Sequence, residues 1–244
     1  MALLEVKNLT KRFAGVVAIQ DVSFAISPGE VVGLIGPNGA GKSTLFNCIM
    51  GFLKPTQGTI HFDGSEISHQ PPWAICRRGV ACTFQKAMPM ANMAARECIL
   101  IGAYMRYGGK KEANHRASEI LSLVGLEKRQ SQPVSSLNMF DRKRVEIGMA
   151  LSTGPQLILL DEIVAGLNPA EAEEILQIIQ GINRTGITLF VVEHVMQVIM
   201  TISHRVIVIH HGQKIAFGSP AEISQNPDVI NAYLGERYRA SGNS

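Results

Sequence analysis

The nine residues GPNGAGKST, at positions 36–44, constrain the fold of this chain more than any other stretch. They match the pattern G-x-x-x-x-G-K-[ST], they follow the apolar run VVGLI, and they precede a segment with helical spacing. Glycines at these places let backbone N–H groups turn inward around a phosphate, and the start of the following helix adds its positive dipole end. The sequence therefore predicts a phosphate-binding loop between a strand and a helix of an α/β fold.

The loop residues have distinct expected roles toward a nucleotide. Lys42 is predicted to reach the β- and γ-phosphates, and Ser43 is predicted to ligate Mg²⁺. The other loop residues predicted to contact the nucleotide are Gly36, Asn38, Gly39, Gly41 and Thr44.

A second apolar run, LILLDE, ends in two carboxylates. Asp161 is placed to hold Mg²⁺, directly or through water, and Glu162 can accept a proton from the water that attacks the γ-phosphate. Two more polar residues follow apolar strands, Gln85 after VACTF and His194 after ITLFVVE. Because ligands bind at the carboxyl ends of strands in open α/β sheets, we expect both to face the same crevice as Lys42 and Asp161.

The distribution of strands and helices predicts one domain with an inserted helical region. Strand patterns dominate the first 65 residues and return after residue 155, where fully apolar strands alternate with helices, the pattern of a covered parallel sheet. Between them, residues 86–154 are rich in Ala, Met, Glu, Lys and Arg with helical spacing. We expect a core of 1–85 and 155–244, a helical insertion at 86–154, and a last helix over 220–234.

Composition excludes several classes of protein. The net charge of +3 comes with no dominant basic stripe, so nucleic acid is not an expected partner. The four cysteines form no CxxC pair, which favours buried thiols in a reducing compartment over disulfides or zinc. The N-terminus lacks the apolar region of a signal peptide, and the longest apolar runs are strand-sized, so no transmembrane segment is expected.

The combined motifs resemble the ATP-binding subunits of ABC transporters along nearly the whole chain. The resemblance implies a P-loop NTPase (RecA-like) core with an N-terminal antiparallel β-subdomain and an inserted α-helical subdomain. It also implies ATP and Mg²⁺ as cofactors, with Ser43, Gln85 and Asp161 as metal ligands and Glu162 as catalytic base. Phe13 matches the aromatic residue that stacks on adenine, and His194 matches the switch histidine.

One segment departs from the family pattern. Residues LNMFD occupy the place of the diagnostic motif L-S-G-G-Q, which begins a helix and binds the γ-phosphate of ATP held by the opposite subunit. The positions concerned are Asn138, Met139, Phe140 and Asp141. Asn138 followed by Asp141 also resembles a capping box, which predicts that a helix begins here.

The substitutions in this segment predict an altered phosphate site. Phe140 stands where a glycine lets the backbone approach phosphate. A carboxylate about 4 Å from a phosphate charge would repel it by roughly 4 kcal/mol at an effective dielectric near 20. Asp141 is therefore expected to turn back onto its own helix, to pair with Arg142 or Arg144, or to spoil the site. The family's proline after the catalytic glutamate is also replaced, by Ile163.

Within the family, KRFAGVVAIQDVSF, AGLNPAE, VEHVM and NPDVINAYLGE resemble the importers of branched-chain (hydrophobic) amino acids most closely. The resemblance implies a second ATPase subunit, two membrane permease subunits and, indirectly, a solute-binding protein. A heterodimer of ATPase chains is expected and a homodimer is the alternative. The chain is expected at the cytoplasmic face of the cell membrane, as a peripheral subunit. KAMPMANMAA, residues 86–95, suits a groove for a helix of the membrane subunit.

Other functions fit the sequence less well. A soluble ABC ATPase acting on DNA or ribosomes usually carries two cassettes or a long coiled coil, and a P-loop kinase would not need Gln85, His194 and a helical insertion. A nucleotide-binding regulatory subunit with little hydrolysis of its own stays open, as does import of another amide or amino-acid-like solute.

Overall fold

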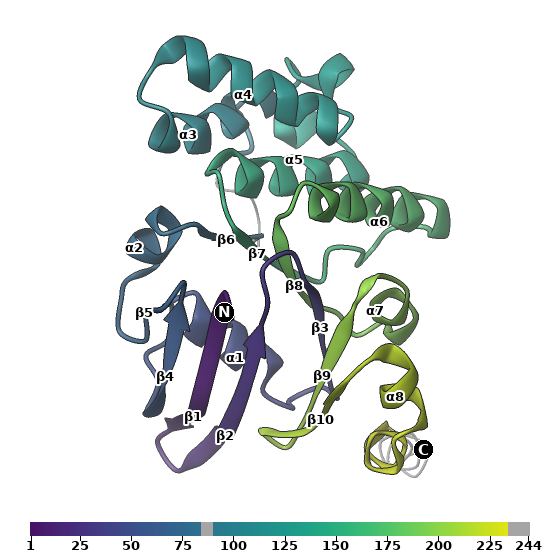
Figure 1. The fold of residues 1–244 in the computed structure, drawn as a ribbon. Helices are drawn as coiled ribbons and strands as arrows, with labels where there is room; N and C mark the ends of the chain where they lie inside the picture. The colour runs from purple at the N-terminus through teal and green to yellow at the C-terminus, as the bar shows by residue number, and fades with distance from the viewer. Residues whose placement is uncertain (84–89, 234–244) are drawn as a thin grey trace. The chain divides into compact units, whose positions relative to one another are not determined.

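The computed structural model describes residues 1–83 and 90–233 and divides into two compact units (Figure 1). The first unit combines two chain segments, Met1–Pro72 and Thr188–Ser244, and the second is Trp73–Ile187.

The first unit contains the predicted antiparallel sheet. Its strands pair in the order β2-β1-β4-β5 and are β1 (Leu4–Phe13), β2 (Val16–Ile26), β4 (Gln57–Phe62) and β5 (Ser65–Glu66). The register between β1 and β2 shifts three times, between Val6 and Arg12. Near these irregularities Asn8 and Asp21 adopt positive φ, and the Asn8 side-chain amide donates to the Asp21 carboxylate at 2.8 Å. β1 and β2 thus form a long antiparallel hairpin with local irregularities.

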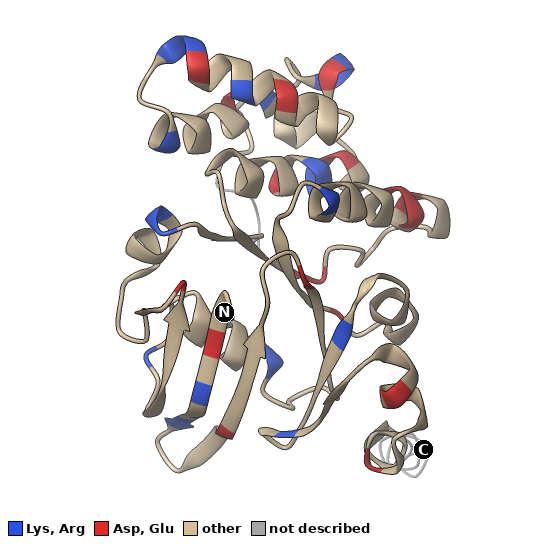
Figure 2. Ribbon diagram, viewed as in Figure 1, with Lys and Arg blue, Asp and Glu red and all other residues tan. Residues whose placement is uncertain are grey.

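The first unit also contains a mainly parallel group of strands. They pair in the order β10-β9-β3-β8 and are β3 (Val31–Ile35), β8 (Thr188–Val192), β9 (Arg205–His210) and β10 (Gln213–Gly218). β3 pairs in parallel with β8 and β9, and β10 pairs antiparallel with β9. Every residue of β3 and β8 is buried and neither strand carries a charge (Figure 2). The sequence pattern did not predict β10, since its half-exposed residues form no apolar run.

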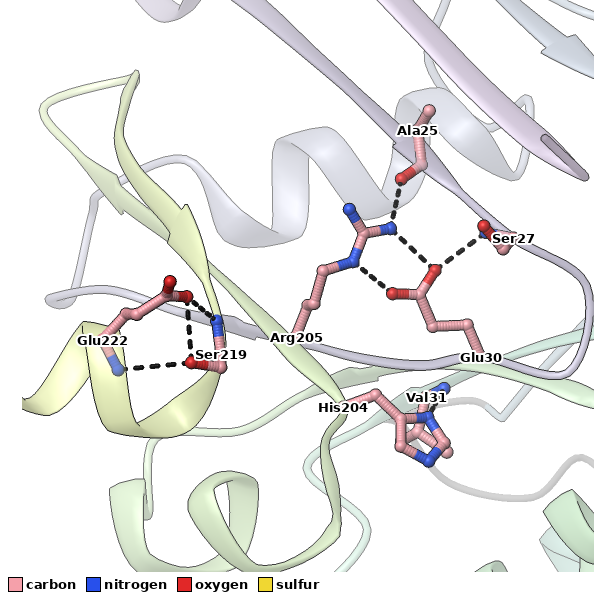
Figure 3. Close-up of polar contacts among 8 residues, drawn as sticks. All are labelled: Ala25, Ser27, Glu30, Val31, His204, Arg205, Ser219 and Glu222. Carbon is pink, nitrogen blue, oxygen red and sulfur yellow. Dashed lines mark hydrogen bonds and ion pairs between the residues drawn. The ribbon is translucent and has the colours of Figure 1, made fainter.

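A carboxylate and a guanidinium join the starts of β3 and β9. Glu30 accepts hydrogen bonds from Arg205 and from the Ser27 N–H, and Arg205 also donates to the Ala25 carbonyl at 3.0 Å (Figure 3). Burial alone raises the pKa of Glu30, but the hydrogen bonds from Arg205 and Ser27 outweigh it and hold the pKa below its ordinary value of 4.5. This pair fastens the two parallel strands at their amino ends.

The helices of the first unit are α1 (Lys42–Ile49), α7 (Met196–Ile202) and α8 (Pro220–Gln225). The prediction of one helix over 220–234 is wrong, because α8 ends at Gln225 and Asn226 is extended. Pro227 follows Asn226, and a residue before proline is driven out of the helical region. The Asn226 side chain then accepts the N–H groups of Asp228 and Val229 and starts a second helical segment.

The second unit contains two parallel strands and most of the helices. Its elements are α2 (Pro72–Arg77, beginning at the division), β6 (Val80–Cys82), α3 (Ala95–Arg106), α4 (Lys110–Leu123), the 3₁₀ turns η1 (Glu127–Arg129) and η2 (Val134–Ser136), α5 (Met139–Ser152), β7 (Leu157–Asp161) and α6 (Pro169–Arg184). The helical region predicted at 86–154 supplies α3, α4 and α5, and its being a separate subdomain stays a prediction. Glycines let α3 and α5 approach closely, because a Cβ at Gly102 would lie 2.0 Å from the Ser152 hydroxyl oxygen.

The expectations on cysteines and membrane segments can be compared with the described residues. Cys48, Cys82 and Cys98 are buried, and burial raises the pKa of the Cys48 thiol to about 11 and that of Cys82 to about 12, so both stay protonated. Among residues 1–83 and 90–233, none of the helices has the length and apolar character needed to cross a bilayer.

Candidate nucleotide-binding and catalytic site

The phosphate loop lies where the sequence predicts it, in the first unit. β3 ends at Ile35 and α1 begins at Lys42, so the loop leads directly into the N-terminus of an eight-residue helix. The Lys42 ammonium folds over the loop and donates to the carbonyls of Gly36, at 2.5 Å, and of Pro37, at 2.9 Å. A helix start and a cation therefore converge on one loop, which is the arrangement that binds phosphate.

Two glycines of the loop are fixed by close approach to neighbouring backbone. Gly41 has φ +107, and a Cβ there would lie 2.5 Å from the Ala18 carbonyl oxygen on β2. A Cβ at Gly36 would lie 2.1 Å from the Ile209 carbonyl oxygen on β9. Both positions exclude a side chain, so the loop is packed between strands as well as shaped by its own turns.

The turn between β9 and β10 supports the loop from outside. The Gly212 N–H donates to the Ala40 carbonyl at 2.9 Å, and the Gln20 N–H donates to the Gly212 carbonyl at 2.8 Å. One residue of this turn thus joins the phosphate loop to β2. This support was not predicted, because nothing in HHGQ marks a residue that contacts a loop so much earlier in the chain.

His194 lies at the same sheet edge as the phosphate loop. β3 and β8 run parallel with Leu34 opposite Val192, so Gly36 and His194 each follow that pair by two residues. Glu193, which follows Val192, is fully buried, whereas His194 is exposed. This register agrees with the strand-end argument from the sequence, and the role of His194 toward a nucleotide stays a prediction.

Phe13 ends β1 and leaves much of its ring in solvent, with 43% of the residue exposed. The Lys11 ammonium lies 5.0 Å from the ring centroid. An aromatic ring that is exposed and carries a nearby cation suits stacking on a flat, electron-rich base beside phosphates.

The two carboxylates of LILLDE lie in the second unit. Asp161 ends β7 and is 8% exposed, and its N–H donates to the Thr83 hydroxyl at 3.2 Å. Glu162 follows with φ +48, an uncommon conformation for a residue with a side chain. Its carbonyl accepts the Ala165 N–H at 3.3 Å, which closes a turn after the strand. Asp161 is thus held in the sheet, while Glu162 starts a turn.

A helix, α6, begins shortly after Glu162. Asn168 caps α6 and forms a capping box with Glu171, each side chain accepting the other's backbone N–H at 3.0 Å. Asn168, the last residue of AGLN, is therefore the N-cap of α6.

The segment LNMFD also begins a helix, with Asn138 as its cap. The Asn138 side chain accepts the Asp141 N–H at 2.8 Å, and α5 starts at Met139. The capping box is not formed, because the Asp141 carboxylate pairs with arginines: it lies 3.1 Å from Arg129 Nε and 3.5 Å from an Arg144 nitrogen. The expected pairing with Arg144 is confirmed, whereas Arg142 donates instead to the Ser135 carbonyl at 2.7 Å.

Because of these contacts with arginines, the side chains of Asp141 and Phe140 do not project from the start of α5 into solvent. Asp141 is 2% exposed, so its charge is buried between two guanidinium groups. The Phe140 ring lies under the Arg144 guanidinium, 3.8 Å from its carbon to the ring centroid. Met139 is 52% exposed and is the apolar side chain that this start presents to solvent. Arg129 lies twelve residues before Asp141 with no pattern to link them, so its part was not predicted.

The other predicted site residues are Gln85, the residues that follow it, and the expected Mg²⁺ ligands. Gln85 and residues 86–89 of KAMPMANMAA lie outside the described residues. No group of three or more His, Cys, Asp or Glu side chains that could hold a metal occurs among 1–83 and 90–233. The expected Mg²⁺ site needs no such group, because one carboxylate and one hydroxyl would act together with phosphate oxygens and water, and it stays a prediction. Ser43 opens α1 and Asp161 ends β7, and both residue types are oxygen donors of this kind.

Family comparisons agree with the motifs. A model of the ABC transporter family matches residues 19–165, and a model described as branched-chain amino acid ATP-binding cassette transporter matches residues 213–239. The high-affinity branched-chain amino acid transport ATP-binding protein LivG of Escherichia coli K12 is 38% identical over 96% of this chain and 98% of its own. The lipopolysaccharide export system ATP-binding protein LptB of the same organism is 34% identical over 98% of this chain and 100% of its own.

Solved structures show the same fold. The ADP conformation of an ATP-binding cassette of an ABC transporter is 30% identical, with a TM-score of 0.88 over 96% of this chain and 99% of that one. A dimeric cassette in a post-hydrolysis state with ADP and Pi is 27% identical, with a TM-score of 0.80 over 89% of this chain and 98% of that one. The phosphate loop, the strand-end carboxylates and these likenesses agree: the chain belongs to the ABC transporter ATP-binding subunits, ATPases that couple hydrolysis to transport.

Proposed function

We propose that this chain is the ATP-hydrolysing subunit of an importer, and that closure of an ATPase dimer drives uptake of branched-chain or other hydrophobic amino acids. The similarity to LivG over nearly the full length carries the proposal, and the branched-chain model at residues 213–239 supports it. LptB, named for lipopolysaccharide export, is also similar, at 34% identity. The C-terminal match favours uptake of amino acids over export.

The residues of the two units are assigned complementary parts in hydrolysis. The loop N–H groups and Lys42 hold the nucleotide phosphates, and Phe13 stacks on the base. When bound, Mg²⁺ neutralises charge on the β- and γ-phosphates, with Ser43, Asp161 and Gln85 as its protein ligands. Glu162 takes the proton from the attacking water, and His194 binds the γ-phosphate.

We propose that the chain pairs with a different ATPase subunit, which completes the site on this chain's loop with a standard L-S-G-G-Q motif. In return, Asn138 and Met139 at the start of α5 face the nucleotide of that partner. The buried pairs of Asp141 with Arg129 and Arg144 remove the repulsion expected from its carboxylate. What still distinguishes this helix start is a side chain at Met139 and Phe140 in place of glycine, which keeps backbone N–H groups farther from a phosphate. The partner's site is therefore the slower of the two.

The membrane subunits are expected to meet the helical region. On α3, Ile101, Tyr104 and Met105 are exposed at helical spacing, with 45%, 47% and 45% of each residue accessible. An exposed apolar stripe of this kind supports docking of a short helix from a permease, with this chain as a peripheral subunit.

An uptake assay tests the proposed solute. Cells whose copy of this chain carries Glu162→Gln should lose accumulation of labelled leucine, isoleucine and valine, while a copy with the exposed Lys111→Met should keep it. Normal amino-acid uptake together with a defect in the outer cell envelope would contradict import and favour export. Loss of uptake only for an amide or another amino-acid-like solute would keep the importer and change its cargo.

A second assay tests the catalytic part. In the complex purified through a tag on this chain, a single turnover of ATP should be abolished by Glu162→Gln. Unchanged single-turnover hydrolysis would favour a regulatory subunit, with hydrolysis on the partner alone.

A further inference from the structure

Lys143 on α5 contacts the backbone of the proposed catalytic residue. Its ammonium donates to the Glu162 carbonyl at 3.2 Å and lies 3.8 Å from the Glu146 carboxylate. The Lys143 side chain is only 12% exposed and that of Glu146 is 17% exposed. Burial raises the pKa of Glu146, and the nearby Lys143 opposes that shift. Lys143 is therefore a largely desolvated cation with two oxygen partners, one of them the main chain of residue 162.

A hydrogen-bond donor to the Glu162 carbonyl matters because the backbone at Glu162 adopts an unfavourable conformation. A residue with a side chain at φ +48 pays about 1–2 kcal/mol for the left-handed conformation, so surrounding contacts must hold it there. One contact is the Ala165 N–H, at 3.3 Å. The next residue, Ile163, is fully buried and fixes the chain beyond it. A hydrogen bond from a charged donor is stronger than one from an amide, so we expect the bond from Lys143 to be firmer than the bond from the Ala165 N–H.

We propose that Lys143 is a positioning residue for Glu162. By holding the 162–163 peptide in the left-handed turn, it sets the direction in which the Glu162 carboxylate leaves the end of β7. Lys143 and Asn138 both belong to the first turns of α5. The same helix therefore positions Glu162 of this chain's own site and presents Asn138 to the partner's nucleotide. The proposal rests on the function of Glu162 proposed above.

The first test measures the turn itself in the purified full chain. Lys143→Met should speed hydrogen exchange at the Ala165 amide about tenfold, the effect of losing one charge-assisted hydrogen bond. Lys143→Arg, which keeps a charged donor, should restore slow exchange. Glu146→Gln breaks the ion pair but leaves the bond to Glu162, so it should exchange like the wild type. Equal exchange at Ala165 in the wild type and Lys143→Met would overturn the proposal.

The second test measures hydrolysis in the complex purified through this chain. Lys143→Met should lower kcat about tenfold with an unchanged KM for ATP, and it should add nothing to Glu162→Gln. If Lys143→Met does not fold, the paired variant Lys143→Met with Glu146→Gln removes both buried charges together and takes its place. Full kcat in the Lys143 variants, with Glu162→Gln inactive, refutes the positioning role alone. Turnover in Glu162→Gln refutes the assignment of Glu162 and with it both proposals.

Discussion

Replacing Gly41 by alanine tests whether the phosphate loop is shaped by its neighbours. A Cβ at position 41 would lie 2.5 Å from the Ala18 carbonyl oxygen, where carbon and oxygen normally stay about 3.3 Å apart or more. The φ of +107 adds about 1–3 kcal/mol of backbone strain for a residue with a side chain. Relief requires the loop or β2 to move by nearly an ångström, so we expect a loss of unfolding free energy of about 3 kcal/mol.

Gly39→Ala is the matched control for backbone strain. Gly39 has φ +77 and open space where a Cβ would lie, so alanine there should cost only about 1 kcal/mol. Denaturant unfolding of the two purified variants without nucleotide measures the difference, which we expect to be about 2 kcal/mol. Equal stabilities would refute the role given to the Ala18 carbonyl.

Nucleotide binding gives a second measure of the same displacement. ATP at one hundred times its Kd stabilises a folded protein by about 2.7 kcal/mol. Moving the loop breaks hydrogen bonds to phosphate worth roughly 1.5–3 kcal/mol each, so loss of two lowers affinity at least hundredfold. At the same ATP concentration the stabilisation of Gly41→Ala should then fall to about 0.4 kcal/mol. A full shift on adding ATP would show that the loop tolerates the methyl group.

Three further variants test other contacts. Asp141→Asn keeps the shape of the side chain but leaves two guanidinium groups without their carboxylate. Because one of these groups, on Arg129, is half exposed, we expect the free energy of unfolding to fall by about 2 kcal/mol. A thermal melt should show this as a Tm lowered by roughly 4–8 °C. Glu30→Gln should lower stability at pH 7 and flatten the acid limb of the pH–stability curve. The carboxylate bound to Arg205 has a pKa below 4.5, so its contribution is present above pH 4.5 and is lost as the pH falls through the lower folded value. Phe13→Ala should raise the Kd for ATP about tenfold in a fluorescence titration, since stacking on a base is worth roughly 1–3 kcal/mol, and should leave inorganic phosphate binding unchanged.

The local motifs predicted their own surroundings well. GPNGAGKST and LILLD determine a loop and a strand end through glycine geometry and apolar runs, both of which are properties of consecutive residues. For the same reason Asn138 could be recognised as a helix start, and it caps α5.

Contacts between distant residues could not be predicted in the same way. The resemblance to a capping box predicted the helix start at Asn138 but did not single out the partner of the Asp141 carboxylate, which pairs with two arginines, one of them on a 3₁₀ turn. Lys143 reads in the sequence as one of three basic residues on a solvated turn, and only the packing of α5 turns it toward Glu162. The break at Asn226 did have a local signal, its following proline, which the apolar pattern over 220–234 obscured.

The hydrogen bond from the Gly212 N–H to the Ala40 carbonyl limits how this chain can be truncated or fused. The loop belongs to the first 72 residues, but part of its frame arrives after residue 187, so an N-terminal fragment would carry the motif without its support. The turn that provides the support leads straight into residues 213–239, which match the branched-chain amino acid ATP-binding cassette transporter model. A tag, truncation or chimaeric junction placed close to residue 213 would therefore be expected to disturb the Gly212 hydrogen bond that supports the phosphate loop.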